Sequence, residues 1–282
     1  MERRLLGIIG RSISYTLSPA MHSEAIEALG LPYSYGVFDV SAEMLPGLFD
    51  ALRAEHVRGA NVTKPHKQAV MPYMDELSDE ARALGAVNTI INEDGRLRGE
   101  NTDVDGVRAS LMPHRNAIRG CSVFVLGAGG ASRAVIYAAA ECSPRTIAVY
   151  NRNPERAREL TQSFRDLFPD VAFEAVEASR IPRAVGDSAL IVNTTTVGMP
   201  PDTSALPVPE TLRFSIHQII FDIIYTPLQT ALLQKAEADG ASVINGLEMF
   251  IQQGARAFTL WTGREFPAAR ARERVLRELG RR

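Results

Sequence analysis

A glycine-rich turn that joins a short apolar strand to a helix constrains the fold of this chain more than any other segment. Residues 122–126 are almost all apolar, and Gly-Ala-Gly-Gly-Ala-Ser follows at 127–132. Residues 131–140 then have the pattern of a helix, and 146–150 form a second apolar strand. Strand, helix and strand in this order make a βαβ unit, in which both strands lie parallel in one sheet. We therefore expect a doubly wound α/β domain around this turn.

The same turn predicts a nucleotide site. Glycines between a strand and a helix let the backbone approach a pyrophosphate at the helix N-terminus. In NAD-binding domains the next strand normally ends at an Asp or Glu that binds the ribose 2′-hydroxyl. Here that strand is followed by Asn151 and Arg152, with Arg156 further along. Because guanidinium groups bind a phosphate through two parallel hydrogen bonds, these residues favour NADP.

The segments before and after this unit also alternate between the two kinds of secondary structure. The predicted strands are 5–10, 33–40, 59–62, 86–92, 96–100, 189–193 and 219–223. The predicted helices are 19–29, 43–54, 76–84, one that starts at 103, then 154–168, 246–261 and 267–279. This alternation indicates a second α/β unit in the first hundred residues.

Composition argues against several functional classes. The net charge of -2 lacks the basic excess of a nucleic-acid binder. No apolar stretch reaches the ~20 residues that would span a bilayer, so no membrane partner is expected. The N-terminus lacks the features of a signal peptide, and we expect a cytoplasmic protein. Neither Cys121 nor Cys142 has the spacing of a zinc or redox pair, and no metal site is expected.

Residues 59–67 predict a site for a small polar molecule. This segment is a strand end that runs into a turn at Pro65, and it places an amide, a hydroxyl and two lysines around one exposed corner. Lysine can act as acid or base for a ketone and alcohol pair when a carboxylate orients it. Lys67 and Asp103 could form such a pair. Taken alone, two charges so far apart in sequence would more often be unrelated surface groups.

Six clusters of residues resemble motifs of the shikimate dehydrogenase family, in the family's order and over nearly the whole chain. They are Thr16–His22, Asn61–Lys67, Asn101–Asp103, Asn193–Met199, Asp222–Leu228 and Asn245–Phe250. The first is similar to the family's Ser-x-Ser-Pro loop, the second to its lysine motif and the third to its aspartate motif. The resemblance implies an NADP-dependent oxidoreductase.

The resemblance also implies a role for individual residues. The catalytic pair would be Lys67 and Asp103. The expected substrate-binding residues are Asn61, Thr63 and Asn88 for ring hydroxyls, Thr16 and Ser18 for the carboxylate, and Tyr225 and Gln253 to close the site. The expected cofactor-binding residues are Gly127, Ala128, Gly129, Gly130 and Ala131 for the pyrophosphate, Asn151, Arg152 and Arg156 for the 2′-phosphate, Met199 and Gly246 near the nicotinamide, and also Thr194.

Two residues depart from the family's pattern. Thr16 stands where the family usually has Ser, which adds a methyl group beside the substrate carboxylate and could alter the balance between shikimate and quinate. Tyr15 replaces the family's common His. Lys64 is a second lysine in the same corner, and its position favours a solvated neighbour rather than a catalytic group.

Together these observations predict two α/β domains with a cleft between them. A substrate-binding domain would comprise residues 1–106 and 245–282, and a Rossmann-type NADP-binding domain would comprise residues 107–244. The reaction that the resemblance implies is the reversible NADPH-dependent reduction of 3-dehydroshikimate to shikimate, a step of chorismate and aromatic amino acid biosynthesis, and we expect a monomer or homodimer. The alternatives are a quinate/shikimate dehydrogenase that uses NAD, and a non-catalytic sensor of dinucleotide and cyclitol acid.

Overall fold

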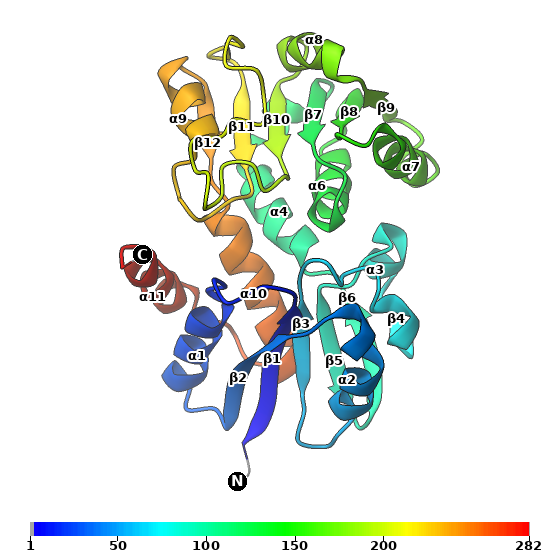
Figure 1. Ribbon diagram of the computed structural model, residues 1–282, viewed down its shortest axis with the longest axis vertical. Helices are drawn as coiled ribbons and strands as arrows, with labels where there is room; N and C mark the ends of the chain where they lie inside the picture. Colours follow the sequence, from blue (N-terminus) through cyan, green and yellow to red (C-terminus); the bar gives the residue numbers. More distant parts are fainter. Residues whose placement is uncertain (1–2, 282) are drawn as a thin grey trace. The chain divides into compact units, whose positions relative to one another are not determined.

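The computed structural model describes residues 3–281 and divides into two compact α/β units (Figure 1). Of the described residues, 3–105 and 251–281 form the first unit, and 106–250 form the second. Each unit is built around its own six-stranded sheet, which confirms the predicted α/β fold class. Residues 1, 2 and 282, which the predicted first domain includes, lie outside the described residues.

The first unit contains a mixed sheet with strand order β2-β1-β3-β5-β6-β4. In chain order the strands are β1 (Arg4–Gly10), β2 (Tyr33–Asp39), β3 (Gly59–Val62), β4 (Glu76–Leu77), β5 (Thr89–Glu93) and β6 (Arg96–Glu100). β1 is parallel to β2 and β3, whereas β5 is antiparallel to both β3 and β6. The predicted hairpin is present as β5 and β6, with its turn at Asp94 and Gly95.

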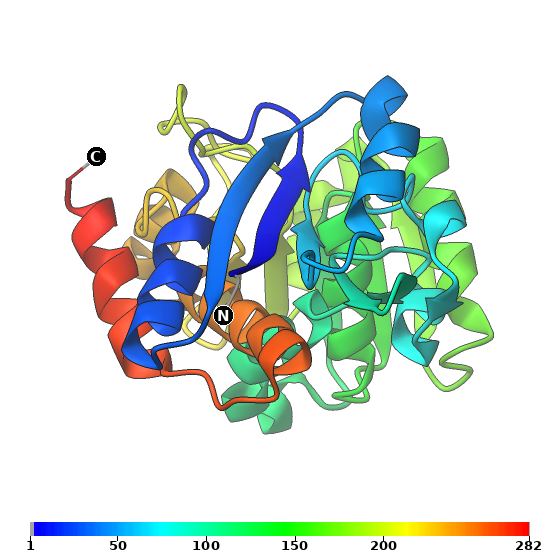
Figure 2. The same ribbon diagram turned by 90° about the horizontal axis from the view of Figure 1, so that it is seen from below.

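Helices from both ends of the chain cover this first sheet. They are α1 (Ser18–Ala28), η1 (Ala42–Met44), α2 (Leu45–Leu52), η2 (Met71–Tyr73), α3 (Asp79–Leu84), the greater part of α10 (Leu247–Thr262) and α11 (Ala268–Leu279). Figure 2 shows α1 and α11 side by side, although they lie at opposite ends of the sequence. Trp261 of α10 is buried and donates through Nε1 to the backbone oxygen of Ile90, at 2.9 Å, which anchors the C-terminal segment on the sheet.

One predicted helix was wrong over its first turn. Residues 76–84 were expected to be helical, but Glu76 and Leu77 form β4 and pair with β6. The helix α3 begins only after Ser78, whose hydroxyl accepts a hydrogen bond from the backbone N–H of Ala81 at 3.2 Å. A serine N-cap of this kind fixes the start of a helix, and the sequence pattern placed that start too early.

The second unit contains a parallel sheet with strand order β12-β11-β10-β7-β8-β9. Its strands are β7 (Ser122–Leu126), β8 (Thr146–Tyr150), β9 (Ala172–Val176), β10 (Leu190–Asn193), β11 (Ile219–Asp222) and β12 (Ser242–Ile244). Its helices are the end of α4 (Asp103–Leu111), then η3 (Met112–His114), α5 (Arg115–Ile118), α6 (Gly130–Ala140), α7 (Pro154–Arg165), η4 (Ala178–Arg180), α8 (Ile181–Gly186) and α9 (Ala231–Ala238). The predicted strand–turn–helix–strand unit is confirmed as β7, α6 and β8.

The strand order places a topological switch point at the centre of this sheet. β8 and β9 follow β7 on one side, after which the chain crosses back to β10 on the other side of β7. In open α/β sheets, ligands bind outside the carboxyl ends of the strands at such a point. β9, α8, α9 and β12 were not predicted, and the two strands lie at the sheet edges with part of their side chains exposed, which weakens their apolar pattern.

Of the helices in residues 3–281, none is long and apolar enough to cross a membrane.

Candidate active site

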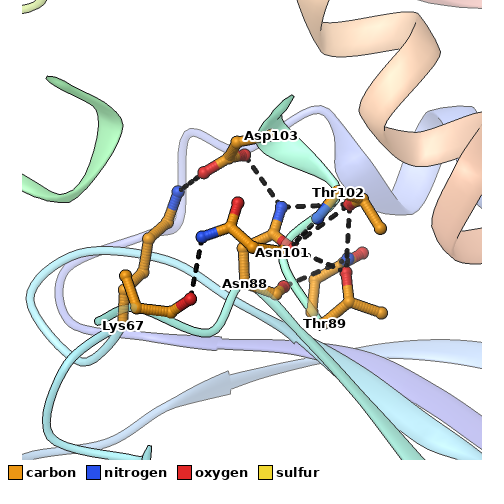
Figure 3. Close-up of polar contacts among 8 residues, drawn as sticks. Lys67, Asn88, Thr89, Asn101, Thr102 and Asp103 are labelled. Atoms are coloured by element: carbon orange, nitrogen blue, oxygen red, sulfur yellow. Dashed lines mark hydrogen bonds and ion pairs between the residues drawn. The ribbon is translucent and has the colours of Figure 1, made fainter. Parts of the chain in front are cut away.

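An ion pair between Lys67 and Asp103 forms the centre of the candidate site (Figure 3). Lys67 lies in the turn after β3, and Asp103 is the first residue of α4. The Lys67 side chain is 16% exposed and that of Asp103 is 7% exposed. The ammonium group is therefore largely removed from water yet still accessible to a small molecule. An ammonium held in this way can give a proton to an oxygen atom or stabilise negative charge on it.

Asn88 fixes the orientation of the Asp103 carboxylate. One carboxylate oxygen of Asp103, Oδ2, pairs with Lys67, and the other, Oδ1, accepts a hydrogen bond from Asn88 Nδ2 at 2.8 Å. Asn88 is oriented in turn because its Oδ1 accepts the backbone N–H of Thr102 at 2.7 Å. Both carboxylate oxygens thus have a partner, as a buried charge requires.

Backbone hydrogen bonds bring three sequence clusters to this point. The N–H of Val87 donates to the backbone oxygen of Lys67 at 2.8 Å, and the N–H of Asn88 donates to that of Glu100 at 3.0 Å. The N–H of Val62 donates to the backbone oxygen of Asn88 at 2.7 Å. The clusters at 59–67, 85–89 and 99–103 therefore meet because β3, β5 and β6 are neighbours in one sheet.

The expected ring-hydroxyl ligands Asn61 and Thr63 lie in the same unit. Asn61 is buried, and its Nδ2 donates to Thr89 Oγ1 at 3.1 Å and to the backbone oxygen of Asn88 at 3.4 Å. Its Oδ1 accepts the hydroxyl of Tyr35 at 2.7 Å. Because both amide hydrogens are used within the protein, a ligand hydroxyl can bind Asn61 only by donating to Oδ1. Thr63 is partly exposed.

The expected carboxylate ligands Thr16 and Ser18 lie together at the start of α1. Thr16 Oγ1 is 3.2 Å from Ser18 Oγ and accepts the backbone N–H of Ser18 at 3.3 Å. The neighbouring Tyr15 is exposed, and the Lys64 ammonium lies over its ring, 5.5 Å from the ring centre. Lys64 is exposed, whereas Lys67 is paired with a carboxylate.

Two further expected substrate ligands lie in different units. Gln253 is a partly buried residue of α10 in the first unit. Tyr225 follows β11 in the second unit, where its ring stacks on Phe250 with a centre-to-centre distance of 4.4 Å.

The turn after β7 has the features of a dinucleotide cradle. Gly127 has a φ of 110°, and a Cβ there would lie 2.5 Å from Thr194 Oγ1, so only glycine fits. Gly129 is exposed, and no atom would lie within 4 Å of a Cβ added to it, so the backbone borders open space at the start of α6. Thr194 Oγ1 is also 2.7 Å from Ser132 Oγ, which joins this turn to the loop after β10. The expected pyrophosphate positions 127–131 therefore fit a phosphate group.

The residues that follow β8 carry two exposed guanidinium groups. The residues after β8 are Asn151 and Arg152, and Asn151 Nδ2 donates to the backbone oxygen of Asn153 at 2.9 Å. Arg152 and Arg156 are exposed, and among residues 3–281 neither guanidinium group has an ion-pair or hydrogen-bond partner. Both guanidinium groups are thus available to an anion.

A buried carboxylate organises the loops at the carboxyl ends of β10 and β11. Asp222 Oδ1 accepts Asn193 Nδ2 and the backbone N–H of Ile224, both at 3.1 Å, and Oδ2 accepts the hydroxyl of Thr230 at 2.7 Å. Asn193 Oδ1 in turn accepts the N–H of Thr195 at 3.1 Å. Burial raises the pKa of Asp222 to about 6, although these three hydrogen bonds to its oxygens oppose the shift.

Two expected nicotinamide contacts lie on or beside these loops. Met199 is partly exposed, in the loop after β10. Gly246 is buried, and a Cβ there would lie 2.0 Å from the backbone oxygen of Ile223, so this glycine is required by close packing against the loop after β11.

Sequence reasoning did not assign a site role to several residues that hold the site residues in place. Thr89 and Thr102 belong to the clusters it identified, and Asn193 and Asp222 belong to its motifs. Tyr35 had no local signal, because its contact with Asn61 depends on the pairing of β1 with both β2 and β3. Among residues 3–281 no group of three or more His, Cys, Asp or Glu side chains could hold a metal ion.

Comparison with known proteins identifies relatives over the full length of the chain. Three family models match it: the shikimate dehydrogenase substrate binding domain at residues 8–90, shikimate / quinate 5-dehydrogenase at 112–201, and the shikimate 5'-dehydrogenase C-terminal domain at 246–276. The chain is 41% identical to the shikimate dehydrogenase (NADP(+)) of Shouchella clausii, over 97% of this chain and 98% of that protein. It is 40% identical to the enzyme of that name from Pelodictyon phaeoclathratiforme, over 98% of each chain.

Solved structures agree with these matches. Shikimate 5-dehydrogenase from Thermus thermophilus, in complex with NADP(H) and shikimate, has a TM-score of 0.85 at 38% identity, over 97% of this chain and 99% of that one. Quinate dehydrogenase from Corynebacterium glutamicum, in complex with NAD, has a TM-score of 0.90 at 32% identity, over 98% of this chain and 100% of that one.

Asp222 predicts a specific dependence of stability on pH. Because its pKa is raised in the folded state, its contribution to stability is fully present below the ordinary value of 3.8 and is lost as pH rises through about 6. The free energy of unfolding of the wild type, minus that of Asp222→Asn, should therefore rise by about 2 kcal/mol when the pH falls from about 8 to about 4.5. Urea unfolding at several pH values measures this difference.

Asp239→Asn is the matched control for this experiment. The pKa of Asp239 is lowered, first by the backbone N–H of Phe214. The free energy of unfolding of the wild type, minus that of Asp239→Asn, should therefore fall on acidification. If the free energies of unfolding of the wild type and of Asp222→Asn changed with pH in parallel, the assignment of a raised pKa to Asp222 would be contradicted.

Proposed function

The chain belongs to the shikimate dehydrogenase family, and we propose that it catalyses the reversible NADPH-dependent reduction of 3-dehydroshikimate to shikimate. The observation that carries this proposal is the nearly buried ion pair of Lys67 and Asp103. A protein that only binds its ligands needs no proton donor at this place. The reaction belongs to the biosynthesis of chorismate and the aromatic amino acids.

Lys67 acts on the oxygen of the substrate carbonyl. When bound, the reduced nicotinamide supplies the hydride that adds to the carbonyl carbon. Lys67 Nζ gives a proton to the oxygen as it becomes an alcohol, and takes one back in the reverse reaction. Asp103 holds the ammonium in place, and Asn88 holds Asp103, so the proton donor is oriented before substrate binds.

The remaining polar groups of the first unit bind the substrate. Thr16 and Ser18 provide adjacent hydroxyls for the carboxylate. The ring hydroxyls bind near Asn61, Thr63 and Asn88. Because both amide hydrogens of Asn61 are used inside the protein, a ring hydroxyl donates to its Oδ1. Tyr225 and Gln253 are further substrate contacts.

The second unit binds NADP. The backbone of residues 127–131 holds the pyrophosphate, and Asn151, Arg152 and Arg156 hold the 2′-phosphate. Met199 and Gly246 lie near the nicotinamide, and Thr194 is a further cofactor contact. This assignment is supported by the open space at Gly129 and by the absence of a carboxylate directly after β8.

A location in the cytoplasm is part of the proposal. Cys121 and Cys142 are both free thiols, which suits a reducing compartment. A monomer or a homodimer is also part of the proposal.

An NAD-dependent quinate/shikimate dehydrogenase is the second candidate. The likeness to a quinate dehydrogenase in complex with NAD supports it. Arg152 and Arg156 after β8, whose guanidinium groups have no ion-pair or hydrogen-bond partner among residues 3–281, favour NADP instead.

Substitution of Lys67 tests the catalytic role directly. Lys67→Ala should lower kcat by roughly 10²–10⁴-fold, the range for loss of a positioned proton donor, while the affinity for NADPH stays unchanged. Steady-state kinetics and NADPH fluorescence titration measure the two quantities. Lys64→Ala is the matched control and should keep near-normal kcat. Near-normal turnover of Lys67→Ala would remove Lys67 from the mechanism.

Substitution of the two arginines tests the cofactor assignment. Arg152→Ala and Arg156→Ala should each lower kcat/KM for NADP by roughly 10- to 100-fold, the value of a hydrogen bond to a charged group, and leave kcat/KM for NAD unchanged. Arg183→Ala is the control, because Arg183 is an exposed arginine of α8 that pairs with Asp187. An equal loss with both cofactors would show that these side chains do not bind the 2′-phosphate.

A further inference from the structure

A directed chain of hydrogen bonds runs from Tyr35 on β2 to the catalytic ion pair. It begins with the hydroxyl of Tyr35, which donates to Asn61 Oδ1 at 2.7 Å. Asn61 Nδ2 then donates to Thr89 Oγ1 at 3.1 Å, so the order of donor and acceptor continues from β3 to β5. Both Asn61 and Thr89 are buried, which leaves these bonds without competition from water.

The chain ends on the carboxylate of Asp103. Thr89 Oγ1 donates to Asn88 Oδ1 at 3.0 Å, and Asn88 Nδ2 donates to Asp103 Oδ1 at 2.8 Å (Figure 3). In every link the donor lies on the side of Tyr35 and the acceptor on the side of Asp103. The last acceptor is a charged carboxylate, which is where the positive ends of such aligned dipoles are most favourable.

The first donor supports the direction of the chain. An amide has one acceptor end and one donor end, so the Tyr35 hydroxyl, by donating to Asn61 Oδ1, favours the orientation in which Nδ2 faces Thr89, and the backbone oxygen of Asn88 favours the same orientation. Thr89 has a single hydroxyl hydrogen, which it can donate to Asn88 Oδ1 at 3.0 Å or to Thr102 Oγ1 at 3.1 Å. Thr102 Oγ1 lies in turn 3.2 Å from Asn88 Oδ1, so both routes lead to Asn88. Removal of the Tyr35 hydroxyl takes away the donor to Asn61 Oδ1, and the amide is then oriented through Nδ2, by Thr89 Oγ1 at 3.1 Å and the backbone oxygen of Asn88 at 3.4 Å.

The ring of Tyr35 is held by aromatic neighbours in the first unit. It stacks on His22 with a centre-to-centre distance of 4.5 Å and an interplanar angle of 12°, and Trp261 lies 6.3 Å away. His22 is fully buried beside the Asn61 side chain. Burial lowers the pKa of His22 to about 3, so it is a neutral packing partner that fixes the position of the Tyr35 hydroxyl.

We propose that Tyr35 is a positioning residue for catalysis, which acts through Asn61, Thr89 and Asn88 to hold Asp103 in line with Lys67. The inference rests on the proposed function of that ion pair. It assigns Tyr35 no contact with substrate or cofactor. Its effect on the reaction depends on an unbroken chain, and this dependence separates it from a residue that only stabilises the fold.

A double-mutant cycle between the two ends of the chain tests the proposal. Tyr35→Phe keeps the ring on His22 and removes only the hydroxyl, and it should lower kcat roughly tenfold, the equivalent of one hydrogen bond. The KM for NADP should stay unchanged. Thr89→Val breaks the chain in its middle with a side chain of the same shape. Tyr35→Phe added to Thr89→Val should therefore lower kcat by no more than about twofold.

Tyr73→Phe is the matched control, because Tyr73 also stacks on a ring in the first unit, that of Phe49 at 4.5 Å, and lies outside the chain. It should leave kcat unchanged. Equal losses from Tyr35→Phe in the wild-type and Thr89→Val backgrounds would overturn the proposal, and so would a Tyr35→Phe variant with normal kcat. Wild-type turnover of shikimate with NADP tests the proposed function, whereas the ratios among the variants test the chain, so the two failures are distinguishable.

Discussion

The ion pair between Lys67 and Asp103 is the interaction on which the rest of the first unit depends. Removing two charges from water costs several kcal/mol for each ion, and the cost is recovered only when the geometry and the remaining hydrogen bonds are good. The structure meets this condition with Asn88 on the second carboxylate oxygen and a backbone N–H on Asn88. The pairing of β3 with β5 and of β5 with β6 brings Asn88 and the backbone N–H of Thr102 to these positions, so this part of the sheet and the ion pair require each other.

The second unit has a different requirement, because it must expose backbone N–H groups at a place where an anion can bind. Parallel strands end at one edge of the sheet, so the turn after β7 and the loops after β10 and β11 meet there without any long-range signal in the sequence. The hydroxyl of Thr194 ties two of these segments together, since it donates to the backbone oxygen of Leu126 at 2.6 Å and lies close to Ser132. Asp222, buried and hydrogen-bonded three times, fixes the remaining loops.

Much of this arrangement could be predicted from the sequence, because its signals are local. Strands such as 122–126 and 146–150 are continuous apolar runs, and the glycine turn between them has one structural setting in which it is common. The edge strands β9 and β12 could not be predicted in the same way, because exposure of alternate residues weakens the apolar signal. Tyr35 was also missed. Its position opposite Asn61 is a product of strand register, and no spacing in the sequence records which residues become neighbours across β1.

The most direct test of the central claim is absorbance of the reduced nicotinamide with purified protein, with shikimate or quinate as substrate and NADP or NAD as cofactor, in four parallel assays. We expect rapid reduction with NADP and shikimate, and much slower reduction in the other three assays. An equal or faster reaction with NAD or quinate would contradict the assignment of Arg152 and Arg156 to a 2′-phosphate. Absence of reduction in all four would contradict the role given to Lys67 and Asp103.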